Sequence, residues 1–142
     1  MPEQKNQARQ HILEFPARPE YSFSNFVVSK GSDVAFQAAR EICTDKPFPR
    51  NTLYLFGGKN LGKTHLLISI GNEAATQGKK AMYVNGLDFV RKTDENANGS
   101  TGQFLSILSD VDLFLLDAVD HISGQRASQE KLYLVYNTLI EN

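Results

Sequence analysis

The segment that most constrains this chain is "GGKNLGKT", residues 57–64, which fits the pattern G-x-x-x-x-G-K-[ST] in full. It follows the apolar run "TLYLF" and precedes residues 63–78, whose apolar spacing is that of a helix ending at Gly78. Glycines let the backbone curl so that N–H groups surround an anion, and the helix N-terminus adds partial positive charge. A strand, a glycine-rich loop and a helix in this order predict a phosphate-binding loop in preference to a chance glycine-rich turn.

The residue types of this loop predict a division of roles. Gly57 and Gly62 allow the tight turn, Lys63 is expected to reach the β- and γ-phosphate oxygens, and Thr64 offers a hydroxyl to Mg²⁺. His65 is expected to be a packed or exposed residue of the first helical turn and not a catalytic one. The predicted nucleotide-contacting residues of this segment are Gly57, Gly58, Lys59, Asn60, Leu61, Gly62, Lys63, Thr64 and His65.

A second candidate position lies in "LFLLDAVDHI", where four apolar residues run into Asp117. An aspartate at the end of a buried strand holds Mg²⁺ in P-loop proteins; the alternative is an aspartate that caps the following turn. Thr64 and Asp117 are therefore the predicted metal ligands. The next residue, Ala118, has no group to orient or deprotonate water, so no catalytic residue is assigned. Asp120 either faces the site or is solvated, and solvation is slightly favoured.

The order of apolar runs along the chain predicts the fold class. The predicted strands are residues 52–56, 80–84 and 112–117, and the predicted helices are residues 32–44, 63–78, 104–110 and 128–141, with a polar loop at residues 93–103. Strands that alternate with helices predict an α/β fold with a parallel sheet in three α/β/α layers. Residues 1–20 are polar and proline-containing, and we expect a flexible tail there before a domain of residues 21–142.

Composition excludes several classes of protein. A formal net charge of −1 over 142 residues predicts that any DNA contact is weak or indirect. No stretch approaches the ~20 apolar residues of a membrane helix, so no membrane association is expected. The single cysteine, Cys43, cannot form an internal disulfide, which favours the cytoplasm.

With the loop and Asp117 placed, the chain resembles the DnaA family of AAA+ ATPases. The matching stretches are "YSFSNFVVS" (21–29), "LYLFGGKNLGKTHLL" (53–67), "AMYVNGLDFV" (81–90), "SDVDLFLLD" (109–117) and "SQEKLYLVYNTL" (128–139). The resemblance implies an AAA+-type P-loop NTPase domain that binds ATP or ADP with Mg²⁺ and serves DNA replication initiation or its regulation. In the family, the stretch matching Asn25–Val28 packs beside the adenine, so the candidate base-pocket residues are Phe26, Val27 and Val28; plain core packing is compatible with that role.

The departures from the family pattern favour one branch of it. Initiators of the family typically carry two adjacent acids where this chain has Asp117 and Ala118, and Hda-type regulators of DnaA resemble this chain in lacking the second acid and in carrying an acid at the position of Asp120. The resemblance therefore implies weak or no ATPase activity, with a DnaA-type initiator as partner and self-association as a further expectation. The alternatives are an active initiator or helicase-loader ATPase that binds single-stranded DNA, and a non-enzymatic adaptor with a structural nucleotide.

The N-terminal segment "QHILEF", residues 10–15, is similar to the short peptides with which bacterial proteins bind the DNA sliding clamp. Leu13 and Phe15 would anchor in an apolar groove while Gln10 hydrogen-bonds at its edge. His11 stands where leucine is usual. The alternative is a tail that packs its apolar residues on its own domain.

The resemblance also implies a central strand after the last predicted helix, between the strand of Asp117 and the strand before the loop. The sequence stops at Asn142, so we expect a fragment without that strand, the sensor residue, the arginine finger or the helical lid. Either the two flanking strands pair directly, or another chain fills the gap. We expect such a fragment to bind nucleotide weakly or not at all.

Overall fold

The computed structural model describes residues 12–44, 52–57, 62–94 and 100–141. The strands are β1 (Ile12–Glu14), β2 (Ala81–Asn85) and β3 (Leu113–Asp117). The α-helices are α2 (Asp33–Glu41), α3 (Lys63–Thr76), α4 (Gly86–Thr93), α5 (Ser100–Ser109) and α6 (Arg126–Glu141), and two short 3-10 helices are η1 (Phe23–Asn25) and η2 (Val119–Ile122).

The sheet has the order β1-β2-β3. β2 and β3 are parallel, with Ala81 opposite Leu113 and Asn85 opposite Asp117, whereas β1 pairs antiparallel with the other edge of β2. The carboxyl ends of the two parallel strands therefore meet at one edge, which is where α/β proteins place their ligands.

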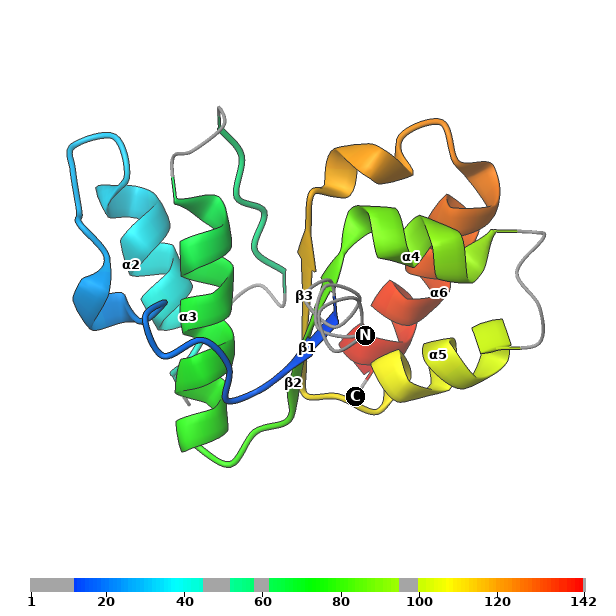
Figure 1. The fold of residues 1–142 in the computed structure, drawn as a ribbon, viewed down its shortest axis with the longest axis horizontal. Coiled ribbons are helices and arrows are strands. Elements are labelled where there is room, and N and C mark those ends of the chain that lie inside the picture. The colour runs from blue at the N-terminus through cyan, green and yellow to red at the C-terminus, as the bar shows by residue number, and fades with distance from the viewer. Residues whose placement is uncertain (1–11, 45–51, 58–61, 95–99, 142) are drawn as a thin grey trace, which may run out of the picture.

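Helices cover both faces of the sheet, with α2 and α3 on one side and α4, α5 and α6 on the other (Figure 1). Successive strand side chains alternate between these layers. Tyr83 and Leu115 belong to the cluster formed with α2 and α3, while Met82 and Val84 belong to the cluster formed with α4, α5 and α6. The predicted three-layer α/β/α arrangement is confirmed.

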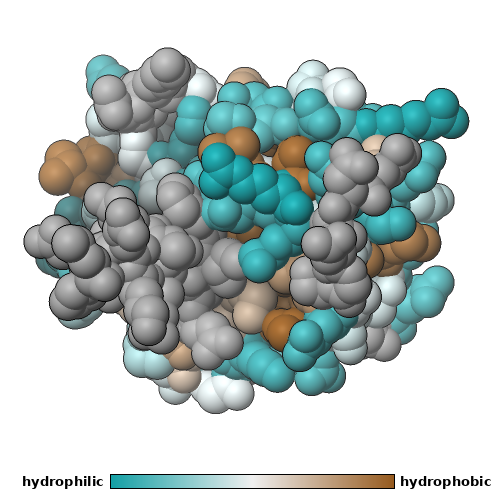
Figure 2. Space-filling model, turned by 45° about the vertical axis from the view of Figure 1, so that its right-hand side comes forward, coloured by the Kyte–Doolittle hydropathy of each residue, from teal (hydrophilic) through white to brown (hydrophobic). Residues whose placement is uncertain are grey.

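The outer surface is mixed in character. On the face shown in Figure 2, hydrophobic residues occur in separate places among hydrophilic ones, as is usual for a surface in contact with water. Among the described helices, none combines the length and the hydrophobicity that crossing a bilayer demands.

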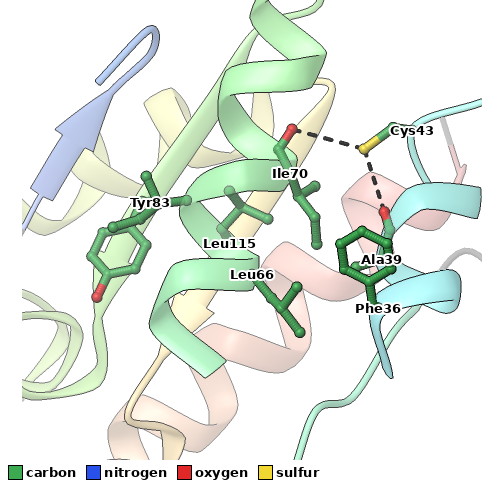
Figure 3. Packing of buried hydrophobic residues seen from close by; sticks show 8 residues of the cluster. Phe36, Ala39, Cys43, Leu66, Ile70, Tyr83 and Leu115 are labelled. Atoms are coloured by element: carbon green, nitrogen blue, oxygen red, sulfur yellow. Dashed lines mark hydrogen bonds between the residues drawn. The ribbon is translucent and has the colours of Figure 1, made fainter. Parts of the chain in front are cut away.

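The cluster between α3 and α2 shows why α3 forms where it does (Figure 3). Leu66 and Ile70 lie on one face of α3 and meet Phe36 and Ala39 of α2. The helix ends as its sequence predicts: Gly78 has a left-handed φ of 73°, and the N–H of Lys79 reaches back to the Ala74 carbonyl at 3.0 Å. This closing pattern requires a residue that tolerates positive φ.

The prediction of a strand at residues 52–56 is wrong. The segment runs beside α3 with Leu53 and Leu55 packed partly against the core, while Tyr54 and Phe56 are 67% and 82% exposed. The burial of these side chains alternates as it does in a strand, but a strand also needs hydrogen bonds to a neighbour. In the described part of the chain β3 pairs with β2 alone, so direct pairing of the two predicted flanking strands is not observed.

Residues 1–20 were expected to form a flexible tail, but the described residues 12–20 are held against the domain. Residues 12–14 form β1 on the edge of β2, and the Ala17 N–H donates to Asn72 Oδ1 at 2.8 Å. Asn72 Nδ2 in turn donates to the Tyr21 carbonyl at 3.0 Å. Backbone pairing and one α3 side chain hold this polar segment to the domain, and neither partner is evident from its composition.

Helix α4 was not predicted, and the predicted loop at residues 93–103 is shorter than expected because α5 begins at Ser100. Asn85 ends β2 and starts α4 directly, since its Oδ1 accepts a hydrogen bond from the Leu87 N–H at 2.9 Å. An asparagine cap at the end of an apolar strand was the available signal for this helix.

Candidate functional site: the phosphate loop and the end of β3

The C-terminal end of the glycine-rich loop has the backbone that the sequence predicts. Gly62 adopts a left-handed conformation with φ 91°, and α3 begins at the next residue. A Cβ at this position would also lie 2.7 Å from the Phe26 ring. Residues Gly58, Lys59, Asn60 and Leu61 lie outside the described residues.

The first turn of α3 supplies donors at the edge of this loop. The first intrahelical hydrogen bond runs from the Leu66 N–H to the Gly62 carbonyl at 3.0 Å, so the N–H groups of the preceding turn have no acceptor within the helix. Lys63 Nζ donates to the carbonyl of Gly57, across the loop. The positive end of α3 therefore lies next to Gly62, and the ammonium group of Lys63 lies at Gly57. Positive charge at both positions suits an anion.

Asp117 lies beside this first turn and accepts hydrogen bonds from three donors. Thr64 Oγ1 and the Tyr83 hydroxyl each donate to Asp117 Oδ2 at 2.6 Å, and the Ala118 N–H donates to Oδ1 at 2.9 Å. The donors come from α3, β2 and the turn after β3. Burial, followed by the hydrogen bond to Asp117 and the charge of that carboxylate, raises the pKa of Tyr83 above its ordinary value, so the phenol remains a proton donor.

The oxygen atoms gathered here are suitable ligands for Mg²⁺. Thr64 and Asp117 offer a hydroxyl and a carboxylate oxygen 2.6 Å apart. Mg²⁺ prefers oxygen ligands and is usually held by one or two carboxylates together with phosphate oxygens and water. Within the described ranges no group of three or more His, Cys, Asp or Glu residues forms an all-protein metal site. The donor set therefore fits a metal that arrives with a nucleotide.

The turn after Asp117 packs tightly on the start of α4. Ala118 has a left-handed φ of 52°, and a Cβ on Gly86 would lie 2.2 Å from the Ala118 carbonyl oxygen. Only glycine fits at residue 86 without movement of this backbone. The side chain of Ala118 has no polar atom, and Asp120 is exposed in η2. The solvated alternative for Asp120 agrees with this exposure.

The predicted base-pocket residues differ in their surroundings. The Phe26 ring stacks on Phe36 at a centroid distance of 5.6 Å and lies against Gly62. Val27 is 87% exposed and Val28 is 44% exposed. Phe26 thus packs between the core and the end of the loop at Gly62. The next two residues in the sequence, Val27 and Val28, expose their apolar side chains.

His65 connects the segment of residues 21–26 to α3. Its Nε2 lies 2.8 Å from the Ser22 carbonyl oxygen, and the rings of Tyr21 and Phe26 each lie 5.2 Å from the imidazole centroid. The structure thus places it as a packed residue of the first helical turn.

Two of the three predicted clamp-binding residues, Leu13 and Phe15, lie in the described part of the chain. Phe15 packs on α3, where a Cβ on Gly71 would lie 2.2 Å from its ring. Leu13 lies in β1 opposite Tyr83, and Gln10 is outside the described residues. The described part of this segment follows the alternative in which the tail lies on its own domain.

Tyr83 and Gly86 are the site residues that sequence reasoning missed. A signal for Tyr83 was present, because a phenol in the middle of the buried strand "AMYVN" needs a hydrogen-bond partner. For Gly86, the residues around it in the sequence gave no sign that the carbonyl of Ala118 would lie close to it.

Comparison with known proteins agrees with this geometry. The family described as the bacterial DnaA ATPase domain matches residues 17–142. The chromosomal replication initiator protein DnaA of Aquifex aeolicus is 31% identical over 138 residues, which is 96% of this chain and 34% of the relative. The corresponding protein of Thermotoga maritima is 35% identical over 132 residues, which is 90% of this chain and 30% of the relative.

Solved structures of this family have the same fold. The structure of AMPPCP-bound DnaA from Aquifex aeolicus matches with a TM-score of 0.79 and 32% identity, over 86% of this chain and 39% of that one. Domain III of the Thermotoga maritima replication initiation protein DnaA matches with a TM-score of 0.78 and 35% identity, over 87% of this chain and 53% of that one.

This chain spans roughly a quarter to a third of the length of the curated relatives it matches. The family match nevertheless extends over most of its residues and includes the loop, Asp117 and the strands and helices that hold them. The chain belongs to the family of bacterial DnaA ATPase domains, which have the AAA+ type of P-loop fold.

Proposed function

We propose that this chain binds an adenine nucleotide weakly, together with Mg²⁺, and serves bacterial DNA replication initiation or its regulation. The observation that carries the proposal is the meeting of Thr64 and Asp117 at 2.6 Å beside the N-terminus of α3. Membership in the DnaA family supports the process, and the relative from Aquifex aeolicus with bound AMPPCP supports the ligand class.

Each part of the site has a role in this proposal. The N–H groups at the start of α3 and the ammonium of Lys63 donate hydrogen bonds to phosphate oxygens. To do so, Lys63 gives up its hydrogen bond to the Gly57 carbonyl. Thr64 and Asp117 hold Mg²⁺, which supplies positive charge against the phosphate oxygens. Phe26, Val27 and Val28 contact the base through their apolar surfaces.

Nucleotide binding can be tested by titrating a fluorescent ADP analogue into the chain in the presence of Mg²⁺. We expect Lys63→Ala to weaken binding about tenfold or more, because a charge-assisted contact to phosphate is lost. Lys80→Ala is the matched control, since this lysine lies before β2 and pairs with Asp110 at 3.4 Å. Equal affinities of the wild type and Lys63→Ala would contradict the proposal.

The finer proposal is a regulator that holds nucleotide and hydrolyses it slowly, similar to the Hda type. Ala118 supports it, since loss of a group that orients or deprotonates water typically slows a reaction ~10²–10⁴-fold. Such a protein would act on a DnaA-type initiator more than on its own nucleotide. An active initiator or loader is the alternative; turnover stimulated by single-stranded DNA and abolished by Lys63→Ala would favour it.

Clamp binding by residues 10–15 stays a separate prediction. It requires β1 to leave the edge of β2 and Phe15 to leave Gly71. A pull-down with a bacterial sliding clamp should recover the wild type and lose the double variant Gln10→Ala/Leu13→Ala. Equal recovery of both would remove the prediction.

A further inference from the structure

Tyr83 occupies an unusual place for a hydroxyl group. It is 5% exposed in the middle of β2 and belongs to the cluster that contains Leu66, Ile70 and Leu115 (Figure 3). The register pairs Tyr83 with Leu115, and Asp117 follows two residues later on the same face of β3. The phenol is therefore long enough to reach diagonally across the strands to the carboxylate.

The two hydroxyls on Asp117 Oδ2 differ in how firmly they are held. Thr64 is exposed at the start of α3, and rotation about one side-chain bond moves its hydroxyl away. Tyr83 is fixed by the packing of its ring, so its hydroxyl cannot leave without movement of the core. Oδ1 is held separately by the Ala118 N–H at 2.9 Å.

A hydroxyl has one proton and two lone pairs. While Thr64 donates its proton to Asp117, its lone pairs remain available to a cation. Tyr83 and the Ala118 N–H together fix the plane and direction of the carboxylate whether or not Thr64 keeps its hydrogen bond. Partners that orient a metal-binding carboxylate in this way commonly affect metal affinity without touching the metal.

We infer that Tyr83 is a positioning residue that orients Asp117 for the Mg²⁺ that accompanies the nucleotide. The inference rests on the proposed function of this site. A purely structural role is the competing explanation, in which the hydrogen bond only satisfies a buried phenol. The two explanations differ in whether loss of the hydroxyl acts on Mg²⁺ in particular.

The test compares the affinity for a fluorescent ADP analogue in Mg²⁺ with that in EDTA, and the ratio of the two dissociation constants is the Mg²⁺ enhancement. Tyr83→Phe keeps the ring and removes the hydroxyl. We expect it to reduce the enhancement about tenfold while the affinity in EDTA stays at the wild-type value. Tyr133→Phe, at a tyrosine that is 64% exposed on α6, is the control and should retain the full enhancement.

A second comparison asks whether Tyr83 acts through Asp117. Asp117→Asn should lose at least as much enhancement as Tyr83→Phe, and adding Tyr83→Phe to it should cause no further loss, because residues that act through one another are not additive. Full enhancement in Tyr83→Phe, or an equal loss in Mg²⁺ and EDTA, overturns the inference. If the wild type itself shows no nucleotide binding, the proposed function fails and the inference falls with it.

A measurement on the wild type covers the case in which Tyr83→Phe does not fold. The ring resonances of Tyr83 can be followed by NMR as nucleotide is added in Mg²⁺ and in EDTA. We expect a shift that depends on Mg²⁺, because the hydrogen-bonded carboxylate gains a cationic neighbour. Identical spectra in the two conditions, with nucleotide bound in both, would contradict the positioning role.

Discussion

Residues 113–117 and residues 52–56 are two short apolar runs that each lead to a predicted site residue, Asp117 and Gly57 respectively, yet only the first is a strand. β3 is paired with β2 along its length and ends in a carboxylate with three hydrogen-bond donors. Residues 52–56 are also apolar but have no strand partner in the described structure, and both of their aromatic rings, Tyr54 and Phe56, are exposed. An apolar run indicates that a segment packs against the core, whereas a strand also requires hydrogen bonds to a neighbouring strand.

The largest expected effect tests this contrast in the core. Leu115→Ala removes a side chain that is 4% exposed in β3 and should lower the free energy of unfolding by about 2–5 kcal/mol. Phe56→Ala, at a side chain that is 82% exposed, should change it by less than about 0.5 kcal/mol. Urea denaturation of both variants checks the prediction. A comparable loss in Phe56→Ala would show that the segment before the loop is buried in solution.

A second prediction concerns the turn that follows β3. Gly86→Ala brings a Cβ to 2.2 Å from the Ala118 carbonyl oxygen, which is backbone and cannot rotate away, so we expect a loss of roughly 1–3 kcal/mol. Gly102→Ala in α5 is the control, because no atom lies within 4 Å of the added Cβ and alanine favours a helix. Thermal unfolding that ranks the two variants in the opposite order would refute this account of the turn.

A smaller effect of opposite sign is expected at Ala118 itself. Its left-handed backbone is unfavourable for alanine and acceptable to glycine, so Ala118→Gly should raise the free energy of unfolding by about 1 kcal/mol or less. Ala75→Gly within α3 should instead lower it by about 1 kcal/mol. Chemical denaturation of this pair checks the sign, and a loss in Ala118→Gly would argue against a strained turn.

The last effect is absent at neutral pH and concerns the α2–α3 side of the core. Burial, with a lesser contribution from Glu73, raises the pKa of Cys43 to about 11 from 9.0. Because the unfolded chain loses this proton at lower pH than the folded one, stability is complete below pH 9 and falls as pH rises toward 11. Cys43→Ala should make the unfolding free energy less dependent on pH over this interval. An unchanged dependence would exclude Cys43 as a contributor.

Local signals in the sequence were enough for much of the site. The spacing of glycines, lysine and threonine predicted the loop and the start of α3, and Gly62 has the positive φ that such a turn requires. The apolar run before Asp117 predicted β3 and a carboxylate at its end. Each of these features depends on residues close together in the chain.

The missed features depend on contacts between distant residues. Tyr83 and Asp117 are 34 positions apart, and Ala17 and Asn72 are 55 positions apart. Composition made residues 12–20 look like a tail because it does not reveal the strand edge and the asparagine that hold them.

The sequence by itself determined the family, the glycine-rich loop and the residues that offer oxygen to a metal, because these follow from residue type and spacing. Only the tertiary structure decided that Tyr83 holds Asp117, that Gly86 admits the turn at Ala118, and that residues 52–56 have no strand partner in the described part of the chain. The physical reason is that hydrogen bonds and close packing depend on which segments lie side by side. That arrangement is set by the sheet register and the layers of helices, not by any one segment.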